Sequence, residues 1–166
     1  VACDALDRLH TTGESHQRVM ILEVMGREAG WIALESGISG GAHVILIPEI
    51  PYDLEKVLQK IRLREKEGSP FSVIVVAEGA KEIGKEAITS EAASTRLQGV
   101  AQLGGVGGFI AKQLSDRIDL EVRCTVLGHV QRGGTPLSFD RILGTRLGAR
   151  AMEAAAEGEM GTMVAL

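Results

Sequence analysis

Cysteine and aromatic residues are scarce in this chain of 166 residues, and it contains no long apolar run. Its two cysteines, Cys3 and Cys124, lie far apart and form no C-x-x-C spacing, so the sequence favours neither a disulfide framework nor a zinc site. The longest apolar stretches, such as residues 73–77, are far too short to cross a membrane. We recognise no signal peptide, and we therefore expect a cytoplasmic protein in a reducing setting with no membrane partner.

The charge balance argues against a nucleic-acid-binding protein. The 22 acidic residues outnumber the 18 Lys and Arg residues, and no basic block stands out. The length suffices to bury a real core, as one domain or as one large lobe plus part of a second. The 21 glycines and the 3% aromatic content fit an α/β protein in which helices pack tightly on a sheet.

The apolar pattern alternates between strands and helices along the chain. Such alternation predicts an α/β fold, with a mostly parallel sheet covered by helices on both faces. The expected strands are residues 20–24, 43–47, 71–77 and 122–126, with a further strand at 163–166. The expected helices begin near residues 2, 30, 54, 109 and 137, and the last of them carries Leu143, Leu147, Ala151 and Ala154 inward.

Other segments carry weaker signals. We expect a polar loop at residues 11–18, and residues 81–102 give no clear pattern. The glycine run 104–108 matches no nucleotide-binding fingerprint and is interpreted as the start of a helix. Trp31 is expected in the core, whereas His10 and His43 are interpreted as packing or surface residues.

Three turns follow predicted strands directly, namely Met25-Gly26-Arg27, Glu78-Gly79 and residues 128–132. Because ligands of such sheets bind outside the carboxyl ends of the strands, we expect these turns to gather at one edge. Arginine forks match phosphate oxygens, histidine donates or accepts a hydrogen bond, and a glutamate suits a sugar hydroxyl. The residues predict a site for a phosphorylated sugar or a similar anion; the alternative is a set of solvated ion-pair and helix-capping residues.

The residues alone do not give the reaction. His16 and His129 share no metal-ligand spacing with each other or with a carboxylate, so we expect no metal site built from them. No stretch matches a P-loop, and no nucleophile is paired with a base.

The combined motifs resemble the signature set of the 6-phosphofructokinases, in the family's order and over essentially the whole chain. The residues that carry the resemblance are V-M-G-R-x-x-G at 24–30, A-E-G at 77–79, G-H-V-Q-R-G-G-x-P at 128–136, D-R at 140–141, S-H-Q-R at 15–18 and the strand with Arg123. The sequence is most similar to the bacterial group that contains ATP-dependent and pyrophosphate-dependent members.

The resemblance implies transfer of a phosphoryl group to the 1-hydroxyl of fructose 6-phosphate, which gives fructose 1,6-bisphosphate in glycolysis. Arg27 would be the catalytic residue, steadying charge on the transferred group, and Glu78 would hold sugar hydroxyls. His129 and Arg132 would grip the 6-phosphate. The implied substrate-binding set is Arg18, Met25, Gly26, Arg27, Glu78, Arg123, His129, Val130, Gln131 and Arg132.

The resemblance also implies an organisation. Residues 1–136 would form the sugar-phosphate lobe, and residues 137–166 a helix and strand that return to a donor-binding lobe. The family's donor loops, Mg²⁺ ligand and catalytic Asp lie in an amino-terminal half that this chain lacks. We therefore expect a fragment that is inactive alone, with Mg²⁺ and either ATP or pyrophosphate supplied to the whole enzyme.

Arg18 and Arg123 would reach into a neighbouring subunit's site, which implies a homo-oligomer, a dimer or a tetramer. His43 replaces a Glu of the regulated bacterial members, so their ADP and phosphoenolpyruvate regulation is not carried over. Two alternatives remain open. One is a non-catalytic regulatory paralogue that binds a sugar phosphate, and the other is an unrelated nucleotide-binding α/β module.

Overall fold

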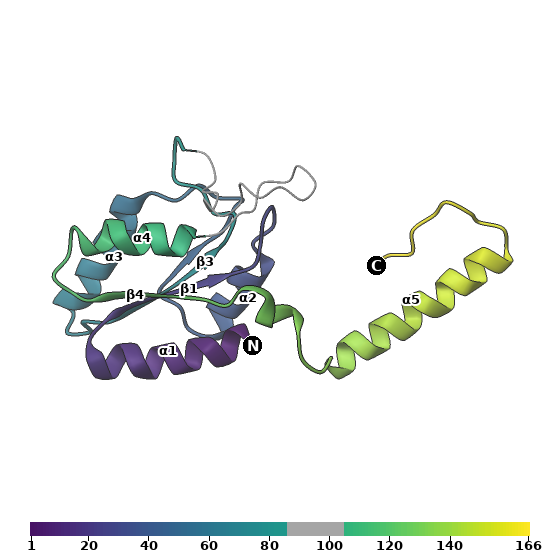
Figure 1. Ribbon diagram of the computed structural model, residues 1–166, viewed down its shortest axis with the longest axis horizontal. Helices are drawn as coiled ribbons and strands as arrows, with labels where there is room; N and C mark the ends of the chain where they lie inside the picture. The colour runs from purple at the N-terminus through teal and green to yellow at the C-terminus, as the bar shows by residue number, and fades with distance from the viewer. Residues whose placement is uncertain (86–104) are drawn as a thin grey trace. The chain divides into compact units, whose positions relative to one another are not determined.

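The computed structural model describes residues 1–85 and 105–166, in two compact units, Val1–Arg132 and Gly133–Leu166 (Figure 1). Most of the segment 81–102, which the sequence leaves unassigned, lies outside the described residues. Among the described helices, none combines the length and apolar character that a membrane crossing requires.

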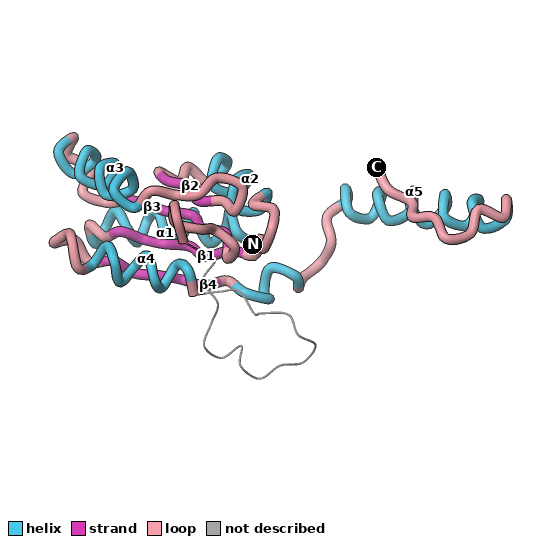
Figure 2. The backbone as a smooth tube through the Cα atoms, turned by 90° about the horizontal axis from the view of Figure 1, so that it is seen from above, coloured by secondary structure: helices cyan, strands magenta, loops and turns pink. Residues whose placement is uncertain are grey.

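The first unit is built on a parallel sheet of four strands in the order β2-β3-β1-β4, which Figure 2 shows side by side. The prediction of a parallel sheet is therefore confirmed. The strands are β1 (Val19–Val24), β2 (Val44–Leu46), β3 (Ser72–Ala77) and β4 (Val122–Val126). β1 is hydrogen-bonded on both edges, with Val19 opposite Ser72 of β3 and Val122 of β4.

Helices cover both faces of this sheet, as the alternation of elements predicts. The helices of the first unit are α1 (Ala2–His16), α2 (Trp31–Ser39), α3 (Leu54–Lys66) and α4 (Val106–Ser115). Figure 1 shows α3 and α4 on one side of the sheet and α1 on the other. Because side chains alternate along a strand, β1 sends Val19 and Ile21 to the α3–α4 side and Met20 and Leu22 to the α1–α2 side.

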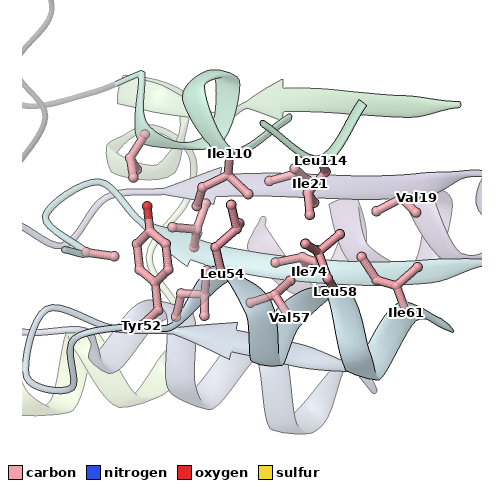
Figure 3. Packing of buried hydrophobic residues seen from close by; sticks show 14 residues of the cluster. Val19, Ile21, Tyr52, Leu54, Val57, Leu58, Ile61, Ile74, Ile110 and Leu114 are labelled. Atoms are coloured by element: carbon pink, nitrogen blue, oxygen red, sulfur yellow. The ribbon is translucent and has the colours of Figure 1, made fainter. Parts of the chain in front are cut away.

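Each face therefore carries its own apolar cluster. Figure 3 shows the cluster on the α3–α4 side, where Ile110 and Leu114 of α4 meet Leu58 of α3 across Ile21 and Ile74. The six residues of β1 and the six of β3 are all buried. Strands covered on both faces read as continuous apolar runs, which is why the sequence identifies them.

The predicted polar loop at residues 11–18 is wrong for its first six residues, because α1 continues to His16. The Thr11 hydroxyl donates to the Arg8 carbonyl oxygen at 3.0 Å, so this polar residue is satisfied within the helix. Gly13 is buried against Met20 of β1, where an added Cβ would lie 3.0 Å from the Met20 Cγ. The packing of Gly13 on the sheet thus outweighs the polar composition.

The expectation that Trp31 lies in the core is also wrong, since its side chain is 65% exposed. α2 packs through small residues instead, with Ala33, Ser36 and Gly37 buried. A Cβ on Gly37 would lie 2.7 Å from the Ile45 side chain, so the helix lies too close to the sheet for a large residue on this face.

The second unit contains α5 (Ser138–Ala156) followed by irregular chain. The expected strand at residues 163–166 does not form, and this segment has no ladder partner among the described residues. Of the positions expected to face inward on α5, Ala154 is buried, Leu143 and Leu147 are half-buried, and Ala151 is exposed. A helical period alone does not show how much of a stripe is covered.

A carboxylate lies buried in the middle strand. The Glu23 side chain accepts hydrogen bonds from the Gly105 N–H at 3.0 Å and the Gly107 N–H at 2.8 Å, and Glu23 is 3% exposed. These donors belong to the first turn of α4, where the helix dipole favours a negative charge. Burial, and then the charge of Glu23, raises the pKa of the neighbouring Cys124 thiol to about 11. Glu23 thus ties α4 to β1.

We expect Glu23→Gln to lower the free energy of unfolding by about 1–3 kcal/mol, because an amide NH₂ would face a backbone N–H that now has a carboxylate acceptor. Urea unfolding of the chain measures this change. The exposed Glu35 supplies a matched control, and Glu35→Gln is expected to cost less than about 0.5 kcal/mol. Equal effects of the two substitutions would contradict the role assigned to Glu23.

Two histidines pack with Phe71 at the amino ends of the strands. The ring centroids of His10 and His43 lie 5.4 Å apart, and both rings meet Phe71 edge-on. The His43 Nδ1 accepts a hydrogen bond from the Val73 N–H at 2.8 Å, which requires an unprotonated nitrogen. Burial, followed by the charges of Arg64, His10 and Lys60, lowers the pKa of His43 from 6.5 to about 4.

The lowered pKa of His43 predicts a loss of stability in acid. The unfolded chain takes up this proton first, so the contribution is complete above pH 6.5 and is lost as pH falls towards about 4. The full pKa difference corresponds to about 3 kcal/mol, and because the half-buried ring is screened by solvent we expect a loss of about 2 kcal/mol. His43→Asn, whose amide oxygen can still accept the Val73 N–H, is expected to reduce this loss. Urea unfolding at several pH values tests this. The exposed His16, changed to Asn, should leave the slope unchanged, and a parallel loss of slope there would refute the assignment.

Candidate functional site

The turns that follow β1, β3 and β4 meet at the carboxyl edge of the sheet. Backbone hydrogen bonds extend the ladders past the strand ends, from the Glu78 N–H to the Val24 carbonyl oxygen at 2.9 Å and from the Leu127 N–H to the Glu23 carbonyl oxygen at 3.1 Å. Behind β4 the chain forms a short 3₁₀-helix, η2 (Gly128–Arg132). The structure therefore brings Met25-Gly26-Arg27, Glu78-Gly79 and η2 to one edge.

Two glycines allow the first two turns to touch. The Gly79 N–H donates to the Gly26 carbonyl oxygen at 3.0 Å, and a Cβ on Gly79 would lie 1.9 Å from the Arg27 carbonyl oxygen. Gly26 has φ +148°, and its Cβ would lie 2.8 Å from the Ala29 carbonyl oxygen. Each of these glycines is approached closely by protein backbone, which fixes Arg27 beside Glu78.

Side chains of Glu78 and Gln131 hold the backbone of the β1 turn. The Gly26 N–H lies 3.4 Å from the Glu78 Oε1, and the Met25 N–H lies 3.4 Å from the Gln131 Oε1. Gln131 also donates from its Nε2 to the Gly128 carbonyl oxygen at 3.0 Å. Contacts of 3.4 Å are long for hydrogen bonds, so they orient the turn loosely. Gln131 thus connects η2 to the end of β1.

The cationic side chains of this edge are uncommitted. Arg27, His129 and Arg132 are exposed, and no hydrogen bond or ion pair to another described residue engages their side chains. Val130 between them is 62% exposed. Guanidinium donors next to a half-buried carboxylate can bind an anion that also carries hydroxyl groups.

Arg18 and Arg123 lie at the opposite end of the strands, away from the carboxyl ends. Arg18 precedes β1 and Arg123 is the second residue of β4, so both stand at the amino ends of the strands. β1 is six residues long, which puts Arg18 roughly 20 Å from Met25. The structure therefore does not bring these two arginines to the other predicted residues. Each instead pairs with Glu121.

Three glutamates have structural roles that the sequence did not predict. Glu23 binds the start of α4, Glu121 pairs with two arginines, and Glu49 accepts the Gly30 N–H at 2.8 Å at the start of α2. A charged residue inside the apolar run 19–24 was an available signal for Glu23. The alternation of Glu121 with Arg123 was another, because residues two apart on a strand share a face.

Comparison with known proteins gives a consistent assignment. The family model described as phosphofructokinase matches residues 1–155. An ATP-dependent 6-phosphofructokinase of Chloroflexus aurantiacus is 54% identical over 166 residues, which are 100% of this chain and 44% of that protein. A pyrophosphate–fructose 6-phosphate 1-phosphotransferase of Amycolatopsis methanolica is 50% identical over 167 residues, covering 100% of this chain and 48% of that protein.

Solved structures agree. Phosphofructokinase from Saccharomyces cerevisiae superposes with a TM-score of 0.77 at 36% identity, over 94% of this chain and 19% of that one. The chain spans a little under half the length of the curated relatives it matches. The match of the family model over residues 1–155 establishes that this chain belongs to the phosphofructokinase family.

Proposed function

We propose that this chain supplies the fructose 6-phosphate site of a 6-phosphofructokinase, which transfers a phosphoryl group to the 1-hydroxyl of that sugar. Family membership supports this proposal. The observation that carries it is the backbone contact of Gly79 with Gly26, which sets Arg27 beside Glu78 and leaves the arginine side chain uncommitted.

His129 and Arg132 of η2 bind the 6-phosphate in this proposal. Arginine presents parallel N–H donors that match two phosphate oxygens, and histidine adds a further donor. Glu78 accepts hydrogen bonds from sugar hydroxyls, while Met25 and Gly26 line the turn beneath the sugar. Gln131 keeps η2 against β1, because its amide already bonds to Met25 and Gly128. Val130 presents an exposed apolar surface next to them.

Arg27 is the proposed catalytic residue. During phosphoryl transfer, negative charge spreads over the oxygens of the transferred group, and a fixed guanidinium that faces those oxygens lowers the barrier. Arg27 is suited to this because its backbone is held by the Gly79 contact while its side chain is free. Most of the catalysis in such a reaction is positioning and charge neutralisation.

Arg18 and Arg123 are proposed to serve the site of a neighbouring copy. Arg18 lies roughly 20 Å from Met25 along β1, and Arg123, opposite Met20, lies roughly 16 Å from it, which is too far for one copy to use them at its own site. A homo-oligomer, a dimer or a tetramer, would bring them to a second copy's substrate. Fructose 6-phosphate would then be bound by residues of two subunits.

The donor is proposed to be ATP or pyrophosphate, since relatives are named for each. Residues 1–136 would form the sugar-phosphate lobe, and residues 137–166 would join a donor lobe. Within the described residues, no group of three or more His, Cys, Asp or Glu side chains is placed to hold a metal ion. The Mg²⁺ of the whole enzyme is proposed to be held by residues outside this chain. The curated relatives are about twice as long, and we expect no turnover from these 166 residues alone.

Calorimetric titration of the chain tests the sugar-phosphate site. We expect binding of fructose 6-phosphate in preference to glucose 6-phosphate, and at least about tenfold weaker binding by Arg132→Ala, because a charge-assisted pair with phosphate is lost. Arg8→Ala removes the same charge from an exposed position on α1 and should bind like the parent. A folded full-length protein that binds neither sugar would refute the proposal.

The role of Arg27 is tested in the full-length protein that contains these residues, assayed with ATP and with pyrophosphate as donor. Arg27→Ala is expected to lower kcat by about 100-fold or more while KM for fructose 6-phosphate changes less, since the charge it faces develops in the transition state. An unchanged kcat with a raised KM would make Arg27 a residue for binding alone.

A further inference from the structure

Glu121, Arg18 and Arg123 form a group that the parallel register sets together. Val19 lies opposite Val122, so Arg18 stands opposite Glu121, and the Val19 N–H donates to the Glu121 carbonyl oxygen at 2.9 Å. Glu121 immediately precedes β4 and continues its ladder to β1, so Arg123, two residues later, carries its side chain on the same face. Arg123 in turn lies opposite Met20, whose side chain belongs to the α1–α2 side.

Each oxygen of the Glu121 carboxylate accepts a hydrogen bond from one arginine. The Arg18 Nε pairs with Oε2, and the Arg123 Nη2 pairs with Oε1. Partial desolvation alone would raise the pKa of Glu121, but the Arg18 hydrogen bond and the charge of Arg123 outweigh it and lower the pKa. The carboxylate therefore stays ionised between two guanidinium groups that would otherwise repel each other.

Both arginines keep most of their donors. Arg18 uses only its Nε towards Glu121, and Arg123 uses only one terminal nitrogen, so each fork still presents N–H groups to a ligand. Solvent reaches all three side chains, of which Arg123 is 62%, Glu121 41% and Arg18 28% exposed. One negative charge against two positive charges leaves a net attraction for an anion.

We propose that Glu121 is a positioning residue of the fructose 6-phosphate site, which holds the guanidinium groups of Arg18 and Arg123 as a preformed pair for the substrate of a neighbouring copy. This inference rests on the proposed function, because it takes both arginines to bind that substrate. Ordering a flexible arginine on binding costs about 0.5–1.5 kcal/mol for each side chain, and a carboxylate that has already ordered two of them reduces this cost.

The direction in which KM changes when Glu121 loses its charge distinguishes a residue that positions the arginines from one that only neutralises them. Simple electrostatics says that removing a carboxylate near an anion's site strengthens anion binding. If Glu121 only masked the arginines, its loss would therefore lower KM. A positioning role gives the opposite result, because two free guanidinium groups on neighbouring strand ends repel each other and move apart.

The experiment measures kcat and KM for fructose 6-phosphate in the full-length protein that contains these residues. Glu121→Gln is expected to raise KM about tenfold and to change kcat less than about twofold. Glu121→Asp keeps the charge on a shorter side chain and should restore part of the loss. Asp119→Asn removes the same charge two residues away, at an exposed position, and should leave KM unchanged or slightly lower.

A mutant cycle with Arg123 shows whether Glu121 acts through the arginines. In an Arg123→Ala background, Glu121→Gln is expected to raise KM only about threefold, since one of its two partners is already absent. A general structural defect would give the same factor in both backgrounds. An equal factor, or an unchanged or lowered KM in Glu121→Gln alone, overturns the positioning role.

Failure of the proposed function gives a different pattern. In that case the parent protein shows no turnover with fructose 6-phosphate and either donor, or Arg132→Ala behaves like the parent. Failure of the Glu121 inference leaves parent turnover and the Arg132→Ala defect in place, and removes only the Glu121→Gln effect.

Discussion

The whole arrangement depends on the position of β1 between two parallel neighbours. β1 is hydrogen-bonded to β3 and β4, and all six of its residues are buried. Since all strands run the same way, whatever follows β1 meets the turns behind β3 and β4, and whatever precedes it meets their starts. A shift of one residue would exchange the two faces of the strand and turn Glu23 away from its partners Gly105 and Gly107, which would leave a buried charge unpaired, so the register is strongly fixed.

Carboxylates perform the local positioning, and burial sets how each one is satisfied. Glu23, 3% exposed, uses both oxygens on backbone N–H groups, because an unpaired buried charge is very costly. Glu78 is half-buried and makes only a long contact to Gly26, which leaves capacity for a ligand. Glu121 is exposed and pairs with two arginines, where a single surface ion pair would contribute little. Its value lies in geometry rather than stability.

The sequence predicted the elements whose signal is local. Apolar runs identified the strands, and the rule for parallel sheets placed Arg27 and Glu78 at one edge. The sequence-based predictions failed where tertiary packing decides. The predicted loop at residues 11–16 is part of α1, because Gly13 packs on the sheet, and Trp31 is exposed, because α2 packs on the sheet through Gly37. The pairing of Glu23 with Gly107 and that of Glu121 with Arg18 were not predictable in the same way, because the paired residues lie 84 and 103 positions apart and only the folded sheet brings them together.

In the proposed enzyme, one substrate site is formed by the carboxyl ends of the strands of one copy and the amino ends of the strands of a second copy. A copy alone would present Arg27 and Arg132 at one edge, and Arg18 with Arg123 at the other. An anionic sugar phosphate gains the full set of cations only where the edges of two copies meet, so substrate affinity depends on assembly. Because ordering a flexible side chain on binding costs free energy, a borrowed arginine that is already oriented binds the substrate more tightly. Glu121 orients both arginines within the copy that donates them, before any ligand binds.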